Sequence, residues 1–135
     1  MLDKTHTKAL ILGTGGASKA VDYGLKSLGL ETIFVSRFQR PGTIQYEDIT
    51  PNVIKEYNVI VNCTPCGMYP NTEECPNLPY QAMDNHTILY DVIYNPDTTL
   101  FMKKGAEHGA NTKNGLEMLL LQAFASWEFW NGKEL

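Results

Sequence analysis

Hydrophobic residues in this chain form short apolar runs that alternate with longer amphipathic stretches. Residues 8–12 (KALIL) and 32–36 (TIFVS) are short, apolar and bounded by turn residues, which is typical of buried strands. Between them, residues 17–28 have helical spacing, and Gly29 stands where the C-terminus of a helix favours a left-handed residue. Strand, helix and strand in this order predict parallel βαβ units.

The rest of the chain continues this alternation, with one gap. Residues 37–43 are polar and turn-like where a doubly wound sheet normally inserts a helix, and residues 62–79 form a long loop. The patterns predict further strands at residues 44–46, 59–61, 88–92 and 110–112, and helices at 51–56, 98–108 and 115–130. We therefore expect an α/β, Rossmann-like, doubly wound and mostly parallel sheet in a single domain with a long C-terminal helix.

Length and charge narrow the possible functions. A chain of 135 residues fits one domain, and 43% hydrophobic with 19% charged residues is an ordinary globular composition. A net charge of −4 argues against nucleic acid as a partner, because a phosphate backbone needs a dense basic face. No apolar run approaches the ~20 residues of a membrane span, and the N-terminus lacks the apolar core of a signal peptide. We expect a cytoplasmic protein without a membrane partner.

Three cysteines cluster in the long loop. Cys63 and Cys66 have Cys-x2-Cys spacing and Cys75 follows, but a zinc site needs four ligands and no fourth cysteine or histidine is near in sequence. We expect reduced thiols and no metal.

A glycine-rich segment lies between the first strand and the first helix. In this position Gly13 permits a tight turn, Gly15 leaves room for a pyrophosphate, and the helix N-terminus presents free N–H groups. Ser18 stands where a third Gly or Ala is usual, and a purely structural turn is the alternative. We expect a dinucleotide phosphate site at Gly13, Thr14, Gly15, Gly16 and Ala17.

The end of the second predicted strand favours NADP over NAD. An NAD domain usually places Asp or Glu there to bind the ribose hydroxyls, whereas this chain has Ser36, Arg37 and Arg40. Guanidinium groups bind a 2′-phosphate through charge-assisted hydrogen bonds that an acid would oppose. Two solvated surface arginines are the alternative. An S-adenosylmethionine-dependent methyltransferase also begins with a strand and a glycine loop, but it usually keeps an acid after the second strand.

Five segments, in this order and spacing, carry a family resemblance. They are GTGGASKA (13–20), SRFQR (36–40), NCTPCGM (62–68), DVIYNP (91–96) and GLEMLLLQ (115–122). Together they resemble the C-terminal domain of shikimate dehydrogenase, over about residues 8–132. The family usually has Asn-Arg-Thr after the second strand, where this chain has Ser36, Arg37 and Phe38.

The resemblance implies NADP-dependent reduction of 3-dehydroshikimate to shikimate, in aromatic amino-acid biosynthesis. It also implies positions for the ligands. Residues 13–17 would hold the pyrophosphate, and Arg37 and Arg40 would hold the 2′-phosphate. Thr64 would line the cofactor cleft, and Val92 and Gly115 would flank the nicotinamide. Tyr94 and Gln122 would reach the substrate.

In the resembling family a separate N-terminal domain carries the catalytic Lys–Asp pair and most of the substrate-binding groups. Only seven residues precede the first predicted strand here. We therefore expect residues 1–135 to be an NADP-binding domain without catalytic residues of its own, active in the full-length enzyme and inactive alone. The alternatives are a related quinate dehydrogenase and a non-catalytic NADP(H)-sensing module.

The last predicted helix points to a partner. Between residues 116 and 130 only Glu117, Gln122, Ser126 and Glu128 are polar, and a helix that is apolar on nearly every side is buried on nearly every side. We expect it to meet the absent domain or a second copy of this chain in a homodimer.

Overall fold

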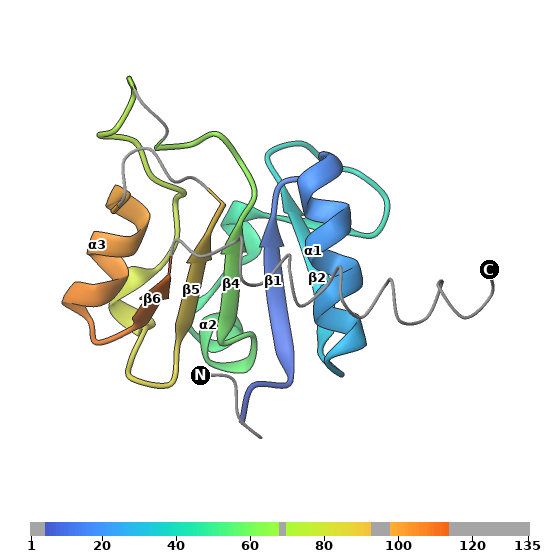
Figure 1. The fold of residues 1–135 in the computed structure, drawn as a ribbon, viewed down its shortest axis with the longest axis horizontal. Helices are drawn as coiled ribbons and strands as arrows, with labels where there is room; N and C mark the ends of the chain where they lie inside the picture. The colour runs from blue at the N-terminus through green and yellow to red at the C-terminus, as the bar shows by residue number, and fades with distance from the viewer. Residues whose placement is uncertain (1–4, 68–69, 93–97, 114–135) are drawn as a thin grey trace, which may run out of the picture.

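The computed structural model describes residues 5–67, 70–92 and 98–113 (Figure 1). Along the chain these residues form β1 (Lys8–Leu12), α1 (Gly16–Ser27), β2 (Glu31–Ser36), β3 (Thr43–Gln45), the 3-10 turn η1 (Tyr46–Asp48), α2 (Pro51–Glu56), β4 (Val59–Asn62), the 3-10 turn η2 (Tyr80–Ala82), β5 (Ile88–Asp91), α3 (Leu100–Glu107) and β6 (Asn111–Lys113). Within these residues, no helix has the length and apolar character that a membrane span needs. The predicted helix at 115–130 lies outside the described residues.

The six described strands form one sheet in the order β3-β2-β1-β4-β5-β6, and every neighbouring pair is parallel. From β1, the next two strands, β2 and β3, are added on one side of the sheet. The chain then crosses over, and β4, β5 and β6 are added in turn on the other side of β1. This confirms the predicted doubly wound sheet, which is parallel throughout its described strands.

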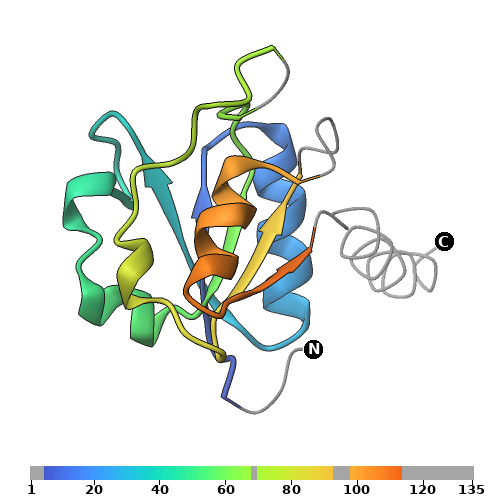
Figure 2. The same ribbon diagram turned by 90° about the vertical axis from the view of Figure 1, so that its left-hand side faces the viewer.

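Helices cover both faces of the sheet. Ala9 and Ile11 of β1 pack in the cluster that includes residues of α1, whereas Leu10 and Leu12 pack in the cluster under α2, η2 and α3. Figure 2 shows these two layers on opposite sides of the strands. All four side chains are fully buried, which explains why a parallel strand reads as an uninterrupted apolar run.

Local capping explains where the helices begin and end. Thr50 caps α2 as predicted, accepting a hydrogen bond from the Val53 amide (3.4 Å). α3 begins two residues later than predicted because Thr99 is extended and its hydroxyl accepts from the Met102 amide (3.3 Å). Gly29, after α1, has a φ of +91°, the left-handed conformation predicted there.

The connection from β2 to β3 contains no helix, as the sequence predicted. Thr43 of β3 pairs with Phe34, which lies two residues before the end of β2. The chain therefore has to run back along the strand direction by only about 7 Å, so the connection can be short. Both the backbone N–H (3.2 Å) and the hydroxyl (2.8 Å) of Thr43 donate to the Arg40 carbonyl. Residues 37–42 are thereby held above the ends of the strands.

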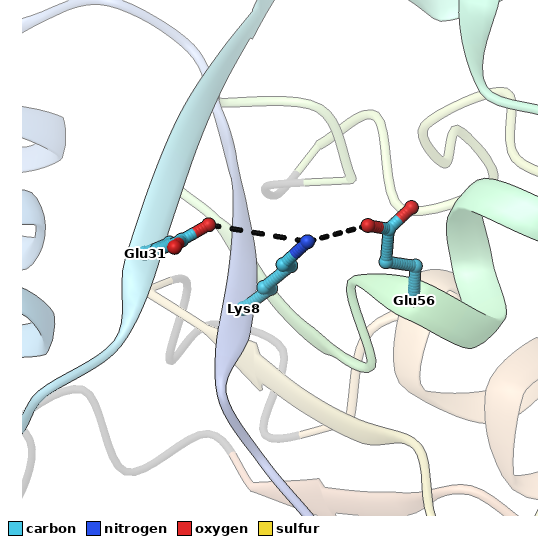
Figure 3. Close-up of polar contacts among 3 residues, drawn as sticks. All are labelled: Lys8, Glu31 and Glu56. Carbon is cyan, nitrogen blue, oxygen red and sulfur yellow. Dashed lines mark hydrogen bonds and ion pairs between the residues drawn. The ribbon is translucent and has the colours of Figure 1, made fainter.

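An ion-pair cluster joins three elements at the opposite, amino-terminal edge of the sheet. The Lys8 ammonium on β1 lies 2.5 Å from Glu56 Oε1 at the end of α2 and 3.9 Å from Glu31 Oε2 on β2 (Figure 3). The hydrogen bond to Glu56 raises the pKa of Lys8 above its usual value. The charge of Lys8 is therefore satisfied within the protein.

Candidate cofactor cleft

A cleft of about 1000 Å³ opens at the carboxyl ends of β1, β2 and β4. Its walls come from residues 13–15 after β1, residues 35–38 and Arg40 around the end of β2, residues 46–47, residues 63–66 after β4, and residues 70–71 and 74–77. It lies where the strand order reverses between β1 and β4, the position at which doubly wound sheets bind ligands.

Gly13 brings two loops of the cleft into contact. Its φ is +105°, a backbone conformation that favours glycine, and a Cβ there would press on Thr64 Cγ2 at 3.2 Å. Its N–H also donates to the Val35 carbonyl (2.9 Å). Gly13 therefore ties the turn after β1 to the ends of both neighbouring strands.

The N-terminus of α1 is open toward solvent. Gly15 is its N-cap, no side chain caps it, and a Cβ on Gly15 or Gly16 would meet no atom within 4 Å. The buried Ser18 turns its hydroxyl inward to the Gly15 carbonyl (2.5 Å), which explains how serine is accommodated there. In the first turn of this twelve-residue helix the Ser18 N–H already donates to the Gly15 carbonyl (3.1 Å), which leaves the N–H groups of Gly16 and Ala17 for a phosphate.

Two cationic side chains flank the cleft at the end of β2. Arg37 and Arg40 are exposed, line the cleft, and form no ion pair with any carboxylate of the described residues. Glu47 and Glu74 also line the cleft, without pairing with either arginine. The buried Ser36 hydroxyl accepts the Phe38 N–H (3.1 Å) and so fixes the turn that carries Arg37. Guanidinium groups at this place are suited to a phosphate.

A buried polar network shapes the floor of the cleft after β4. Asn62 Oδ1 accepts from the backbone N–H (3.1 Å) and the hydroxyl (2.6 Å) of Thr64. The Asn62 amide donates to both carboxylate oxygens of Asp91, its register partner on β5 (3.2 and 3.3 Å). The Thr99 hydroxyl donates to the same carboxylate (2.7 Å). Thr64 is thus positioned by residues that never reach the surface.

The three cysteines are free and half-buried. Burial raises the pKa of Cys63 to about 12, with the Asp91 charge adding to the effect, and burial also raises the pKa of Cys66. The described part of the chain contains no group of three or more His, Cys, Asp or Glu side chains placed to hold a metal ion.

Comparison with known proteins agrees with this geometry. Shikimate dehydrogenase (NADP(+)) of Prochlorococcus marinus strain MIT 9215 is 35% identical over 156 positions, covering 99% of this chain and 54% of the relative. A solved chorismate mutase/shikimate 5-dehydrogenase fusion protein from Clostridium acetobutylicum is 36% identical with a TM-score of 0.66, over 95% of this chain and 48% of that chain. No family model matches. This chain is related to the C-terminal portion of shikimate dehydrogenases.

A complex of known structure extends the likeness. Shikimate 5-dehydrogenase from Thermus thermophilus, solved with NADP(H) and shikimate, is 26% identical with a TM-score of 0.68, over 92% of this chain and 49% of that chain. The chain spans about half the length of the shikimate dehydrogenases it matches. The alignment with the Prochlorococcus enzyme is longer than the 135 residues here, so that enzyme carries residues with no counterpart in this chain.

The structure brings together most of the residues that the sequence and the shikimate dehydrogenase resemblance assigned to the cofactor. Those that line the cleft are Gly13, Thr14, Gly15, Ser36, Arg37, Arg40 and Thr64. Gly16 and Ala17 follow directly, exposed in the first turn of α1. Val92 does not line the cleft. It is half-buried against the hydrophobic cluster that contains Ala9, Ile11 and residues of α1, and its N–H donates to the Asn62 carbonyl (3.0 Å). Tyr94, Gly115 and Gln122 lie outside the described residues.

Two parts of the cleft were not predicted. Phe38 of the SRFQR segment and Tyr46 of η1 both line the cleft, and neither residue had been assigned to a ligand. The partnership of Asn62 with Asp91 was also missed, although DVIYNP had been noted. Knowledge that β4 and β5 are adjacent and in register would have paired these two side chains.

Proposed function

We propose that this chain is the NADP(H)-binding half of a shikimate dehydrogenase-like oxidoreductase. The observation that carries the proposal is the pair of arginines, Arg37 and Arg40, that lack carboxylate partners among the described residues and stand beside a glycine-loop cleft. Such a pair favours a ligand with a 2′-phosphate over one with two ribose hydroxyls.

The residues of the cleft fit the dinucleotide by chemistry and space. The pyrophosphate would lie at the N-terminus of α1, where the side chains missing from Gly15 and Gly16 leave open space. Arg37 and Arg40 would hold the 2′-phosphate, and the Asn62 network would keep Thr64 in place beneath the cofactor. When bound, NADPH supplies the hydride for a C3 ketone such as that of 3-dehydroshikimate.

The proton-transfer groups belong elsewhere in this proposal. The pKa values of Cys63 and Tyr46 in the cleft wall are both raised to about 12 by burial, so neither titrates near neutral pH. We place the catalytic Lys–Asp pair in a substrate domain outside these 135 residues. Tyr94 and Gln122 would reach the substrate, and Val92 and Gly115 would flank the nicotinamide.

Assembly and location follow from the same proposal. The apolar residues 116–130 would pack against the substrate domain or, in a homodimer, against a second copy of this chain. A biosynthetic dehydrogenase of this kind would act in the cytoplasm.

The proposal is tested by binding and turnover measured on the same preparation. Titration with NADPH should give saturable binding. NADP⁺ with shikimate should give no NADPH above background, because this proposal places the proton-transfer groups in a substrate domain outside these 135 residues. Absence of NADPH binding would reject the cofactor assignment. Saturable turnover by the chain alone would reject the half-enzyme assignment.

A further inference from the structure

Phe38 is a large hydrophobic side chain left in solvent beside the cleft. It is 64% exposed, compared with 41% for Tyr23 and 44% for Leu28, the other exposed large hydrophobics of the described residues. Unlike those two, which belong to α1 and its end, Phe38 lines the cleft. Water contact with a phenyl ring is unfavourable, and binding a planar apolar face would remove it.

The turn that presents Phe38 is anchored on both sides. The Phe38 N–H donates to the Ser36 hydroxyl (3.1 Å), and the Gln45 side-chain amide donates to the Arg37 carbonyl (3.4 Å). Beyond Phe38, Thr43 donates twice to the Arg40 carbonyl. The ring therefore stands on a turn organised before any ligand arrives, which lowers the entropy cost of binding.

The surroundings of the ring indicate which part of a dinucleotide would meet it. The Arg37 guanidinium carbon lies 5.8 Å from the centroid of the Phe38 ring, within cation–π range. Arg37 and Arg40 flank Phe38 in sequence, and they are the groups proposed to hold the 2′-phosphate. Because the 2′-phosphate sits on the adenosine ribose, the base next to these arginines is the adenine and not the nicotinamide.

We propose that Phe38 is the adenine-stacking residue of this cleft and contributes to dinucleotide affinity independently of the 2′-phosphate. One face of its ring would take the purine, while Arg37 links the ring to the phosphate. The inference rests on the proposed NADP(H) site. It adds a second source of affinity, a flat apolar contact, to the charge-based one.

Affinity measurements on three variants test this inference. We would titrate wild type, Phe38→Ala, Phe38→Leu and Phe38→Trp with adenosine 2′,5′-bisphosphate, NADPH and NADH. Phe38→Ala should weaken all three by about fivefold to a hundredfold, the range expected for loss of one base–aromatic stack. Because NADPH and NADH share the adenine, their affinity ratio should stay at the wild-type value. Phe38→Trp should bind like wild type, and Phe38→Leu should fall between the two.

The controls separate this inference from the function on which it rests. Inorganic pyrophosphate has no base, so its competition with NADPH should have the same inhibition constant in wild type and Phe38→Ala. Wild-type NADPH binding with unchanged affinity in Phe38→Ala would overturn the stacking role and leave the cofactor site standing. Full affinity in Phe38→Leu would reject stacking in favour of a plain apolar contact. A wild-type chain that binds no NADPH would overturn both.

Discussion

At the amino-terminal edge of the sheet, Lys8 is held between Glu31 and Glu56, whereas at the carboxyl-terminal edge Arg37 and Arg40 face a cleft without a carboxylate partner among the described residues. Both edges terminate the same parallel strands. At the amino-terminal edge the charged side chains form ion pairs with one another. At the carboxyl-terminal edge two arginines, the first N–H groups of α1 and the Phe38 ring are exposed. We infer that the first serves the fold and the second serves a ligand that is anionic and partly aromatic.

The same contrast extends below the surface. The cleft is supported by the buried Asn62–Asp91 network and by the half-buried Cys63 thiol, while Glu31 and Glu56 of the Lys8 cluster are exposed. Buried polar groups are costly to leave unsatisfied, whereas solvated ion pairs contribute little. Changes at the floor of the cleft should therefore reduce stability more than changes at the opposite edge.

The largest effect on stability should come from alkaline pH. An unfolded Cys63 titrates near 9 and the folded one near 12, so above pH 9 the unfolded chain binds fewer protons than the native one. The protonated Cys63 thiol therefore makes its full contribution to the free energy of unfolding below pH 9. As the pH rises from 9 toward 12, the free energy of unfolding falls by up to about 1.4 kcal/mol per pH unit. Urea unfolding of wild type from pH 8 to 11 should show this fall, and Cys63→Ala should reduce its slope. Equal slopes would show that the folded protein does not raise the pKa of this thiol.

Asn62→Ala should give an effect of similar size. It removes the amide nitrogen that donates to both oxygens of the buried Asp91 carboxylate, and the acceptor for the backbone N–H and hydroxyl of Thr64. We expect the free energy of unfolding in urea at pH 7 to fall by about 3 kcal/mol, because the buried Asp91 carboxylate loses one of its donors and Thr64 loses its acceptor. A loss below about 1 kcal/mol would mean that the network does not support the cleft.

Two glycine variants should separate fold from function within the cleft. Gly13→Ala places a Cβ at positive φ and 3.2 Å from Thr64, and should cost about 1–2 kcal/mol of unfolding free energy. Gly16→Ala meets no protein atom and should stabilise α1 by up to about 1 kcal/mol while obstructing the phosphate site. Thermal unfolding of both variants would measure the change in stability, and titration with NADPH would measure the change in affinity. Tighter or unchanged NADPH binding in Gly16→Ala would contradict the assignment of the phosphate to the N-terminus of α1.

The smallest effect belongs to the opposite edge. Glu56→Gln should leave the urea midpoint within error of wild type, because the Lys8 pair is solvated and Gln keeps the shape of the side chain. NADPH affinity should also be unchanged. A clear loss of stability would show that the edges differ less than we infer.

Much of this fold was predictable because its signals are local. The run KALIL gave the bounds of β1 correctly, since a parallel strand buried on both faces is apolar throughout. Gly29 and Thr50 marked helix ends through conformational and capping preferences that reside in single residues. The three-residue strands β3 and β6 were each displaced by one residue, because so short a segment has little pattern.

Only the part of the cleft that depends on local sequence was predictable. The glycine loop and the two arginines belong to a motif whose parts lie at known distances along the chain. The pairing of Asn62 with Asp91 depends on the register of β4 against β5, which joins residues far apart in sequence. Phe38 and Tyr46 reach the cleft because the β2–β3 connection is short and turns back over the strands, a property of tertiary structure.

The most direct test of the account is calorimetric titration of the chain with NADPH and NADH, in wild type, Arg37→Ala and Lys8→Ala. Wild type should bind NADPH about tenfold to a hundredfold more tightly than NADH, from charge-assisted bonds worth roughly 1.5–3 kcal/mol. Arg37→Ala should remove most of that difference, and Lys8→Ala, a cation removed from the other edge, should leave it intact. Equal wild-type affinity for the two cofactors would contradict the assignment of the cleft to NADP(H).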